Sequence, residues 1–279
     1  MTPGKSLSSR LVLLPALGLV ALLVTFTVVP LVVLLVRAAA TGEGASLITL
    51  WSDAATLHAL RGTLVTSAGA AAMAFVLGLP LAVLLERTDL PWRGALRAAF
   101  TLPTAIPPYI WCMGWIALAN PKAGLINRVL GEGTFDVYST LGIAFVLGGA
   151  GLPLVMLPAA AVLARIDPSL EEAARIFGAG PLRTLLEVPV RLALPAAASG
   201  AALVFLFGAA SFGVPYLLGV TATPPTPTLT TRIYSEMLMG KGGLWTATGL
   251  SLQLLVMAVV VLGLSRLLGR AGRTALLSG

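Results

Sequence analysis

Charged residues are scarce in this sequence. Asp, Glu, Lys and Arg make up 10% of its 279 residues, against about a quarter in an ordinary soluble chain. Hydrophobic residues reach 57%, the mean hydropathy is +0.96, and the apolar residues stand in runs of about twenty. A water-soluble core of this size could not bury so many. The sequence therefore predicts an all-α membrane protein with several spanning helices.

Residues that form disulfides or bind metals are almost absent. The chain has one Cys and one His, Cys112 and His58, so a disulfide framework is excluded and no zinc or haem site is expected. The nearest approach to a phosphate-binding loop is Gly4-Lys5-Ser6, which lacks the glycine five positions earlier that a Walker A motif requires. We therefore expect this chain to bind no metal or other cofactor and to hold no catalytic residue.

Six stretches of about twenty residues carry no charged side chain, which is the length that a helix needs to cross a bilayer. They are Leu11–Val36, Gly62–Leu85, Ala98–Ala119, Thr140–Ala164, Leu192–Gly219 and Leu244–Ser265. The first is too long for the apolar part of a signal peptide, which spans about 7 to 15 residues. The sequence thus predicts six transmembrane helices.

The charges between these spans indicate the orientation. Twelve of the 18 Lys and Arg residues fall on the side that holds both termini and the segments 86–97 and 165–191. The acidic residues are nearly balanced, so the positive-inside rule places that side in the cytoplasm. The net charge of +7 is then a feature of topology, and nucleic acid is not expected as a partner.

The predicted spans divide the chain into three parts. Residues 1–61 hold the first helix and an outer loop, residues 62–265 form a core of five helices, and residues 266–279 are a cytoplasmic tail. No segment has the composition of a separate soluble domain.

The cytoplasmic segment 165–191 is long for a hairpin and is typical of two short helices. The first can begin at Asp167, with Pro168 in the first helical position, or at Ser169, with Glu172 three residues later as a capping box. Either start places a helix directly after the fourth span.

Apolar residues follow on one face of this helix. Leu170, Ala173, Ala174 and Phe177 are spaced at i, i+3, i+4 and i+7, and Gly178 can end the helix in the left-handed conformation. Lipid, the protein's own helices or a partner could cover such a face. The two alanines favour a partner, because small side chains allow close approach.

The segment continues with a second predicted helix. Gly180 and Pro181 can restart the chain, and further leucines follow. On the first helix, Glu171 and Arg175 are four residues apart and can pair on the solvent face.

These residues resemble a known motif. The run Glu172-Ala173-Ala174-x-x-x-Gly178, with Val188 ten residues later and then Pro195, is similar to the EAA loop of permeases of type I ABC importers. The resemblance implies the MetI-like transmembrane fold of that family, in a bacterial cytoplasmic (inner) membrane. It also implies that Glu172, Ala173, Ala174, Arg175, Phe177 and Gly178 contact an ATPase.

The same resemblance implies a set of partners. A cytoplasmic ABC ATPase dimer, which binds the ATP and Mg, would receive the loop, and a second permease half would complete the pathway. A periplasmic or extracytoplasmic binding protein would deliver the substrate to the outer loops. The chain itself would be a non-catalytic membrane subunit.

Further motifs within residues 62–265 are similar to ferric-iron permeases, in particular to the N-terminal half of forms in which two six-span halves are fused. They are Leu79-Pro80-Leu81-Ala82, Arg87-Thr88-Asp89-Leu90-Pro91, Ile106-Pro107-Pro108-Tyr109, Gly124-Leu125-Ile126-Asn127, Phe212-Gly213-Val214-Pro215 and Thr230-Thr231-Arg232-Ile233-Tyr234. The chain departs from the subgroup at Val190-Arg191, where Leu-Pro is common, and at Ser211, where an acid is common. Ferric iron is therefore the expected substrate, with no iron-coordinating site in the spans.

Alternatives remain open at this point. Permeases for putrescine or spermidine, thiamine and phosphonate share the loop, and an ion-coupled secondary transporter would need no ATPase. A secondary transporter usually carries ionisable residues inside its spans, and the six stretches have none. The candidate residues for lining a pathway are Tyr109, Trp111, Ser211 and Tyr216.

Overall fold

The computed structural model describes residues 5–40, 49–239 and 241–277, and within these ranges the chain is helical and has no strand. The helices up to the middle of the chain are α1 (Lys5–Ala40), α3 (Ala54–Arg87), α4 (Arg93–Thr101), η1 (Leu102–Ala105), α5 (Pro108–Ala119), α6 (Leu125–Leu130) and α7 (Thr140–Leu163). Those that follow are α8 (Pro168–Ile176), α9 (Pro181–Leu185), η2 (Leu186–Val190), α10 (Arg191–Ala210), α11 (Gly213–Gly219), α12 (Leu229–Leu238) and α13 (Lys241–Leu277).

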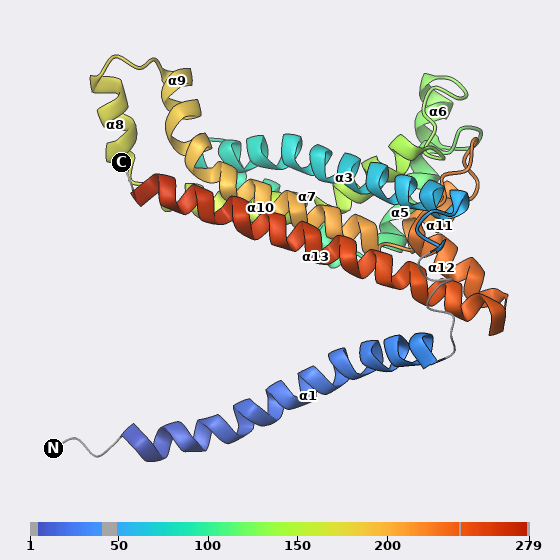
Figure 1. Ribbon diagram of the computed structural model, residues 1–279. Helices are drawn as coiled ribbons and strands as arrows, with labels where there is room; N and C mark the ends of the chain where they lie inside the picture. Colours follow the sequence, from blue (N-terminus) through green and yellow to red (C-terminus); the bar gives the residue numbers. More distant parts are fainter. Residues whose placement is uncertain (1–4, 41–48, 240, 278–279) are drawn as a thin grey trace.

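Helices α3, α7 and α10 pack together as the centre of a bundle, and α13 lies along α10 (Figure 1). Small residues make this packing close. A Cβ on Gly200 of α10 would lie 2.3 Å from the carbonyl oxygen of Leu154 on α7, and one on Gly148 of α7 would lie 3.0 Å from that of Ala70 on α3. Glycine at these contacts lets helix backbones approach each other, as is common between membrane helices.

Four helical segments of the described chain are long and apolar enough to cross a membrane, namely Ala54–Arg87, Thr140–Leu163, Pro181–Ala210 and Gly243–Arg266. They correspond to the second, fourth, fifth and sixth predicted spans. The first predicted span, Leu11–Val36, lies within α1, where the apolar helical stretch Pro15–Pro30 is fully described and the rest of the span lies partly outside the described residues. Six spans and the sidedness of the termini therefore stay predictions, although the all-helical membrane fold is confirmed.

The third predicted span is not one straight helix. Arg93–Ala105 and Pro108–Ala119 meet at an angle of 109°, as a broken span or a re-entrant loop. Ile106 and Pro107 are extended at the bend, with ψ of 125° and 135°. The cause is local, because Pro107 and Pro108 lack backbone donors and the residue before a proline is driven out of the helical region.

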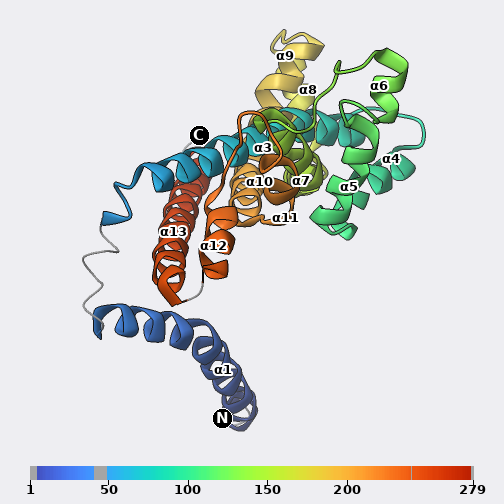
Figure 2. The ribbon, with the colours of Figure 1, turned by 90° about the vertical axis from the view of Figure 1, so that its right-hand side faces the viewer.

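The fifth predicted span also has a break. Helix α10 ends at Ala210, Ser211 is extended with ψ of 128°, and α11 begins at Gly213. Figure 2 shows that α4, α5 and α6 lie on one side of the central bundle, whereas α12 and α13 lie on the other. Helix α1 lies apart from the bundle in both views (Figures 1 and 2).

The two ends of the bundle differ. At one end, α8 and α9 project beyond the central helices, and the C-terminal end of α13 lies on the same side (Figure 1). At the other end, α6, α11 and α12 cluster around the N-terminal end of α3. The first end carries the segment predicted to be cytoplasmic, so the opposite end corresponds to the predicted outer side.

Candidate coupling site and outer surface

Asp167 is the N-cap of α8. Its carboxylate accepts a hydrogen bond of 2.9 Å from the backbone N–H of Ser169, and Pro168 occupies the first helical position. That bond stabilises the ionised form and lowers the pKa of Asp167 below its ordinary value. Of the two starts that the sequence left open, the structure adopts the one at Asp167, and Glu172 serves in no capping box.

Gly178 ends α8 in a Schellman motif. The N–H of Ala179 donates to the carbonyl of Ala174 at 3.0 Å, and the N–H of Gly178 donates to that of Arg175 at 3.0 Å. Gly178 has φ of +86°, a conformation that favours glycine, and its hydrogens face open space. The chain restarts at Gly180, with Pro181 as the first residue of α9.

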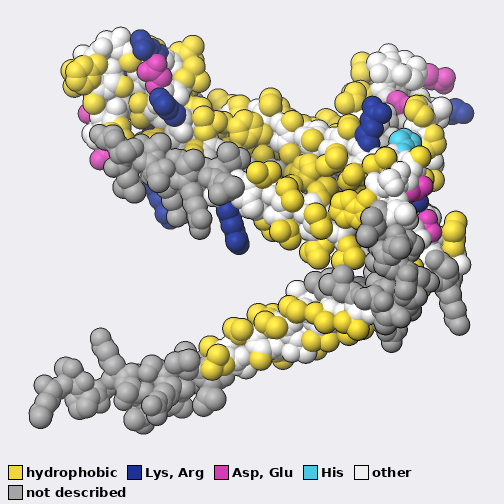
Figure 3. All heavy atoms as spheres, in the orientation of Figure 1, with side chains coloured by type: hydrophobic (Ala, Val, Ile, Leu, Met, Phe, Trp, Pro, Cys, Tyr) yellow, Lys and Arg dark blue, Asp and Glu magenta, His cyan; other side chains and the backbone are white. Residues whose placement is uncertain are grey.

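The predicted apolar face of α8 has little cover. Phe177 is 90% exposed and Leu170 is 50% exposed, Ala173 is exposed and Ala174 is half-buried. Ile176 and Leu182, at 83% and 68%, extend this surface around the turn. Figure 3 shows that hydrophobic side chains lie beside charged ones on the projecting end of the molecule.

The polar residues of α8 point in different directions. Glu172 and Arg175 are exposed, whereas Glu171 has a side chain only 17% exposed. Glu171 does not pair with Arg175 as the sequence predicted. It forms an ion pair of 3.2 Å with Arg87, the last residue of α3.

Arg87 also binds the end of α7. Its Nη2 donates to the carbonyl oxygens of Leu163 at 2.8 Å and Ile166 at 3.3 Å. Arg87 was not predicted from the sequence to have a functional role, because it was considered only as a positive charge at the end of a span. The available signal was an arginine that ends an apolar helix, since such a residue can satisfy the free carbonyls of a neighbouring helix end.

The second helix of the loop is the inner end of the fifth span. Helix α9 continues through η2, a stretch of π-helix over Leu186–Val190, into α10 without a turn. Pro189 is buried within that stretch. The loop proper therefore ends near Gly180 rather than at Arg191, because a π-helical stretch accommodates the proline without breaking the helix.

The four candidate pathway residues lie near the predicted outer side but are not a single cluster. Trp111 is half-buried and donates to the carbonyl of Val146 at 3.1 Å, so it packs against α7. Tyr109, 47% exposed, lies against Gly213 of α11. Ser211 is half-buried, and its carbonyl accepts a bond of 2.8 Å from Thr230.

Tyr216 belongs to an aromatic cluster that the sequence did not predict. Its ring stacks on Phe212 with centroids 5.1 Å apart, and Tyr234 of α12 lies 4.9 Å from Phe212 and 5.6 Å from Tyr216. All three side chains are between 36% and 41% exposed. The cluster joins α11 to α12 and presents half-exposed aromatic edges beside the break at Ser211.

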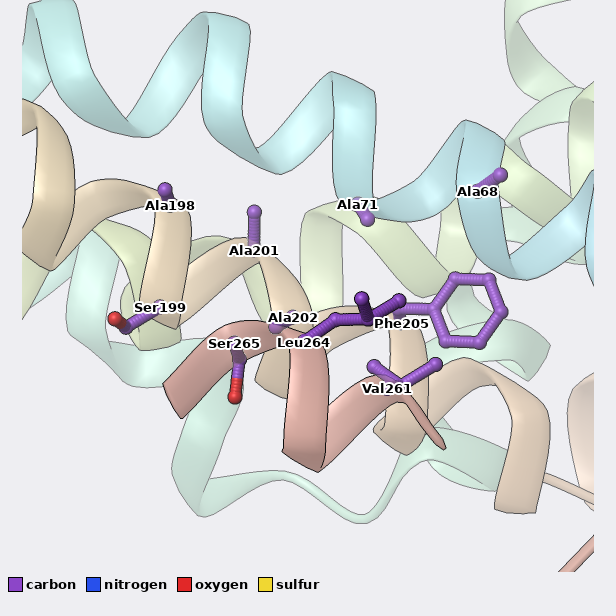
Figure 4. A pocket seen from close by; sticks show the side chains of 10 residues that line it. All are labelled: Ala68, Ala71, Ala198, Ser199, Ala201, Ala202, Phe205, Val261, Leu264 and Ser265. Atoms are coloured by element: carbon purple, nitrogen blue, oxygen red, sulfur yellow. The ribbon is translucent and has the colours of Figure 1, made fainter. Parts of the chain in front are cut away.

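Among the described residues, two cavities lie outside this region. One, of about 350 Å³, is apolar and lies between α3, α10 and α13, where its walls are mainly alanines with Phe205, Val261 and Leu264 (Figure 4). Among the described residues that line it, the only polar side chains are those of Ser199 and Ser265. None of these described lining residues carries a charge that could bind an ion.

The other cavity, of about 280 Å³, lies at the predicted outer end between α3 and the proline-rich segment before α12. His58 and Arg61 line one wall, and Pro224 and Pro225 line another. Thr140 and Thr226 also line it, and a hydrogen bond of 2.8 Å joins their hydroxyls. Both basic side chains are exposed, and within the described chain neither forms an ion pair.

The parts of the chain that the structure describes contain no set of side chains that could bind a resident metal ion. No three His, Cys, Asp or Glu side chains among these residues are grouped as they would be around a metal ion. Cys112 is buried in α5, among apolar side chains of the core.

With this geometry in place, comparison with known proteins identifies the family. Residues 74–273 match the model of the binding-protein-dependent transport system inner membrane component. The chain belongs to this family. The match includes Arg87, the whole of α8 and α9, and all four candidate pathway residues. The expected location in the inner membrane and the expected importer family are thereby confirmed.

A relative from Mycobacterium tuberculosis, the molybdenum transport system permease protein ModB, is 29% identical over 258 residues, which cover 91% of this chain and 92% of the relative. The ferric-iron subgroup expected from the sequence is not confirmed by such a relative, so the substrate stays open. Solved structures with the same fold are 20% identical to this chain, and that level of identity supports the fold alone.

The fold is shared with a bacterial alginate ABC transporter, solved in complex with an alginate pentasaccharide-bound periplasmic protein. That chain has a TM-score of 0.73 and 20% identity, with 94% of this chain and 96% of that chain covered. A chain of the methionine ABC transporter MetNI in inward-facing form has a TM-score of 0.59, with 20% identity and coverage of 77% and 95%. The MetI-like transmembrane fold is therefore confirmed.

Proposed function

We propose that this chain is the transmembrane permease subunit of an ABC importer and forms half of the translocation pathway for a substrate that an external binding protein delivers. The observation that carries this proposal is the exposed apolar surface at the projecting end of α8 and α9. Ile176 and Phe177 are more than four-fifths exposed there, beside the charged Glu172 and Arg175. Such a surface on a helix outside the bundle is typical of a partner interface.

The partner proposed for this surface is a cytoplasmic ATPase dimer that binds ATP and Mg. Burying a fully exposed Phe or Ile side chain gains roughly 1.5–3 kcal/mol, so Phe177 and Ile176 are natural anchors for a groove. Ala173 lets the partner's backbone approach. Gly178 sets the angle between α8 and α9, because its left-handed conformation turns the chain between them.

Glu172 and Arg175 serve as the polar rim of this contact. Both are exposed on the same short helix as the apolar face, with no ion pair within the described chain. Charged residues at a rim steer the approach of a partner and fix its register more than they add affinity. In this proposal the chain itself has no catalytic role, and the partner hydrolyses ATP.

A second permease half completes the pathway in this proposal, either a copy of this chain or a related one. The half-exposed aromatic cluster of Phe212, Tyr216 and Tyr234 is the favoured pathway surface of this half, together with Tyr109. Aromatic edges of this kind offer weak contacts to a passing solute, which suits a path that must release its substrate.

The external binding protein is proposed to dock at the outer end, over the cavity beside His58 and Arg61. The proline-rich wall is stiff, and the two basic side chains face outward without an acidic partner in the described chain. A carboxylate on a lobe of the binding protein would complement them.

We propose two candidate substrates, and a different observation supports each of them. The relative named for molybdenum transport favours molybdate, a compact oxyanion that a path without acidic residues does not repel. The motifs within residues 62–265 that resemble ferric-iron permeases favour ferric iron as the second candidate. The described spans hold no grouped acidic ligands, so for either substrate the choice would be made by the binding protein.

The test is purification of the tagged chain from native membranes in mild detergent, with mass spectrometry of the retained proteins, followed by uptake assays in proteoliposomes. Recovery of an ATPase with two permease halves, lost on Ala173→Arg and on Phe177→Asp, supports the proposal. ATP-driven uptake of radiolabelled molybdate or of ferric iron then identifies the substrate. A chain that purifies alone and transports without ATP would instead be a secondary transporter.

A further inference from the structure

Arg87 occupies an unusual position, because it touches three separate segments. It ends α3, it donates to the carbonyl oxygens of Leu163 and Ile166 at the end of α7, and it pairs with Glu171 on α8 at 3.2 Å. The side chains of Arg87 and Glu171 are 15% and 17% exposed, so water screens this pair little.

The neighbouring residue joins a fourth segment to the same point. Glu86 forms an ion pair with Arg97 on α4. Two consecutive residues at the end of α3 thus hold α4 on one side and the ends of α7 and α8 on the other.

Helix α8 has few other attachments. Its packing contacts are mainly with α9 and η2, which follow it in the chain. Among the described residues, the pair with Arg87 is its one side-chain ion pair or hydrogen bond to the central bundle. Helices α3 and α7, in contrast, share the most extensive packing in the bundle.

The junction is also incompletely satisfied. Glu171 Oε1 lies 3.2 Å from Arg87 Nη1 without the geometry of a hydrogen bond, and within the described chain Arg87 Nε has no hydrogen-bond partner, although both Oε1 and Nε are buried. A buried polar atom without a hydrogen-bond partner costs free energy. The free energy of this junction therefore falls when the two groups shift relative to each other or receive another partner. A contact of this kind suits an element that has two positions.

Glu171 and Glu172 point in different directions, about 100° apart around the axis of α8. Glu172 is exposed on the side of the proposed ATPase contact, whereas Glu171 is directed to the bundle. A force applied to the exposed side of α8, where Glu172 lies, would therefore reach α3 and α7 through the adjacent residue Glu171.

From these contacts we propose that Arg87 is the positioning residue that transmits movement of α8 to the inner ends of α3 and α7, with Glu171 as its partner on the coupling helix. The inference rests on the proposed function, in which an ATPase moves α8. Arg87 pairs with α8 through Nη1 and bonds the two carbonyl oxygens at the end of α7 through Nη2. The single ammonium of lysine can keep the charge that pairs with Glu171, but it cannot make both sets of contacts in this geometry.

The experiment compares Arg87→Gln, Arg87→Lys and Glu171→Gln with Arg93→Gln as the control. Arg93 is an exposed arginine at the start of α4 and has no ion pair in the described chain. Each variant of the full chain is purified, and hydrogen exchange is followed for residues 168–176. Faster exchange in Glu171→Gln and Arg87→Gln, but not in Arg93→Gln, is the expected result.

The second readout uses the complete importer in proteoliposomes and measures molybdate or ferric iron taken up per ATP hydrolysed. The expected outcome is normal assembly and basal hydrolysis, with uptake per ATP about tenfold lower in Glu171→Gln and Arg87→Gln. Arg87→Lys recovers part of the loss. A merely structural role would lower assembly and hydrolysis together and would overturn the proposal, as would unchanged exchange at α8.

The two proposals fail separately. If the wild-type chain shows no ATP-driven uptake, the importer function is wrong. If wild-type uptake is normal and the Arg87 and Glu171 variants keep the same uptake per ATP, only the role of Arg87 is overturned.

Discussion

Arg232 on α12 donates a hydrogen bond of 2.8 Å to the carboxylate of Asp53, the residue that caps the N-terminus of α3. The same carboxylate oxygen accepts from the N–H of Thr56 at 3.0 Å and from its hydroxyl at 2.9 Å. Arg232 is also bonded to the Thr56 hydroxyl at 2.7 Å and lies 3.6 Å from Glu236. One arginine thus joins the outer ends of α3 and α12.

This network predicts a pH-dependent stability. The bond from Arg232, followed by those from Thr56, lowers the pKa of Asp53 below its ordinary value. The stabilisation should therefore be fully present above a pH of about 4, the ordinary pKa of Asp, and be lost as the pH falls through the lower folded pKa. Asp53→Asn should lower the melting temperature in detergent at pH 7 and flatten its change on acidification. The same acid-induced drop in both proteins would contradict the prediction.

The basic wall of the outer cavity predicts how the binding protein docks. Arg61→Glu should reduce the stimulation of ATP hydrolysis by substrate-loaded binding protein about tenfold, because it places a like charge opposite the proposed carboxylate. Arg61→Lys should keep most of the stimulation, and wild-type stimulation should weaken as salt rises. Basal hydrolysis without binding protein should stay unchanged. Stimulation that is equal in Arg61→Glu and wild type would show that docking occurs elsewhere.

Gly178 and Gly180 provide a matched test of the turn between α8 and α9. Both have open space around the Cβ position, but Gly178 has φ of +86° and Gly180 has φ of −66°. Serine at 178 should therefore cost roughly 1–2 kcal/mol of local stability, whereas serine at 180 is a favourable N-cap. We expect Gly178→Ser to weaken retention of the ATPase during purification and Gly180→Ser to leave it intact. Equal retention in both would remove the turn from the coupling contact.

How far the sequence predicts this molecule depends on the range of the interaction. The caps of α8, its end at Gly178 and the restart at Pro181 were predictable, because each depends on residues within one turn of helix. The bend of 109° before Pro108 was not, although its prolines were visible. A proline pair shows that a helix is interrupted, but the direction that the chain then takes depends on what packs against it.

Interactions between distant residues were the ones missed. Glu171 was expected to pair with Arg175 four residues away, but the structure pairs it with Arg87. Arg232 lies far along the chain from Asp53, and the aromatic cluster joins Phe212 and Tyr216 to Tyr234 across two helices. No local pattern encodes such contacts, since they depend on how α3, α8 and α12 are placed by the packing of the bundle.

The close approach of α10 to α7 gives the last prediction. A methyl group on Gly200 would lie 2.3 Å from the carbonyl oxygen of Leu154 and 2.7 Å from the Cα of Val155, both of which are backbone atoms that cannot rotate away. Gly200→Ala should therefore force the two helices apart and cost roughly 1–3 kcal/mol, through overpacking of the bundle. Gly114→Ala in α5 is the control, because nothing lies within 4 Å of its Cβ position. The measurement is the melting temperature of each variant in detergent, and the structure predicts a clear drop for Gly200→Ala alone. If both variants melt like the wild type, α7 and α10 do not approach as closely in the membrane as this packing requires.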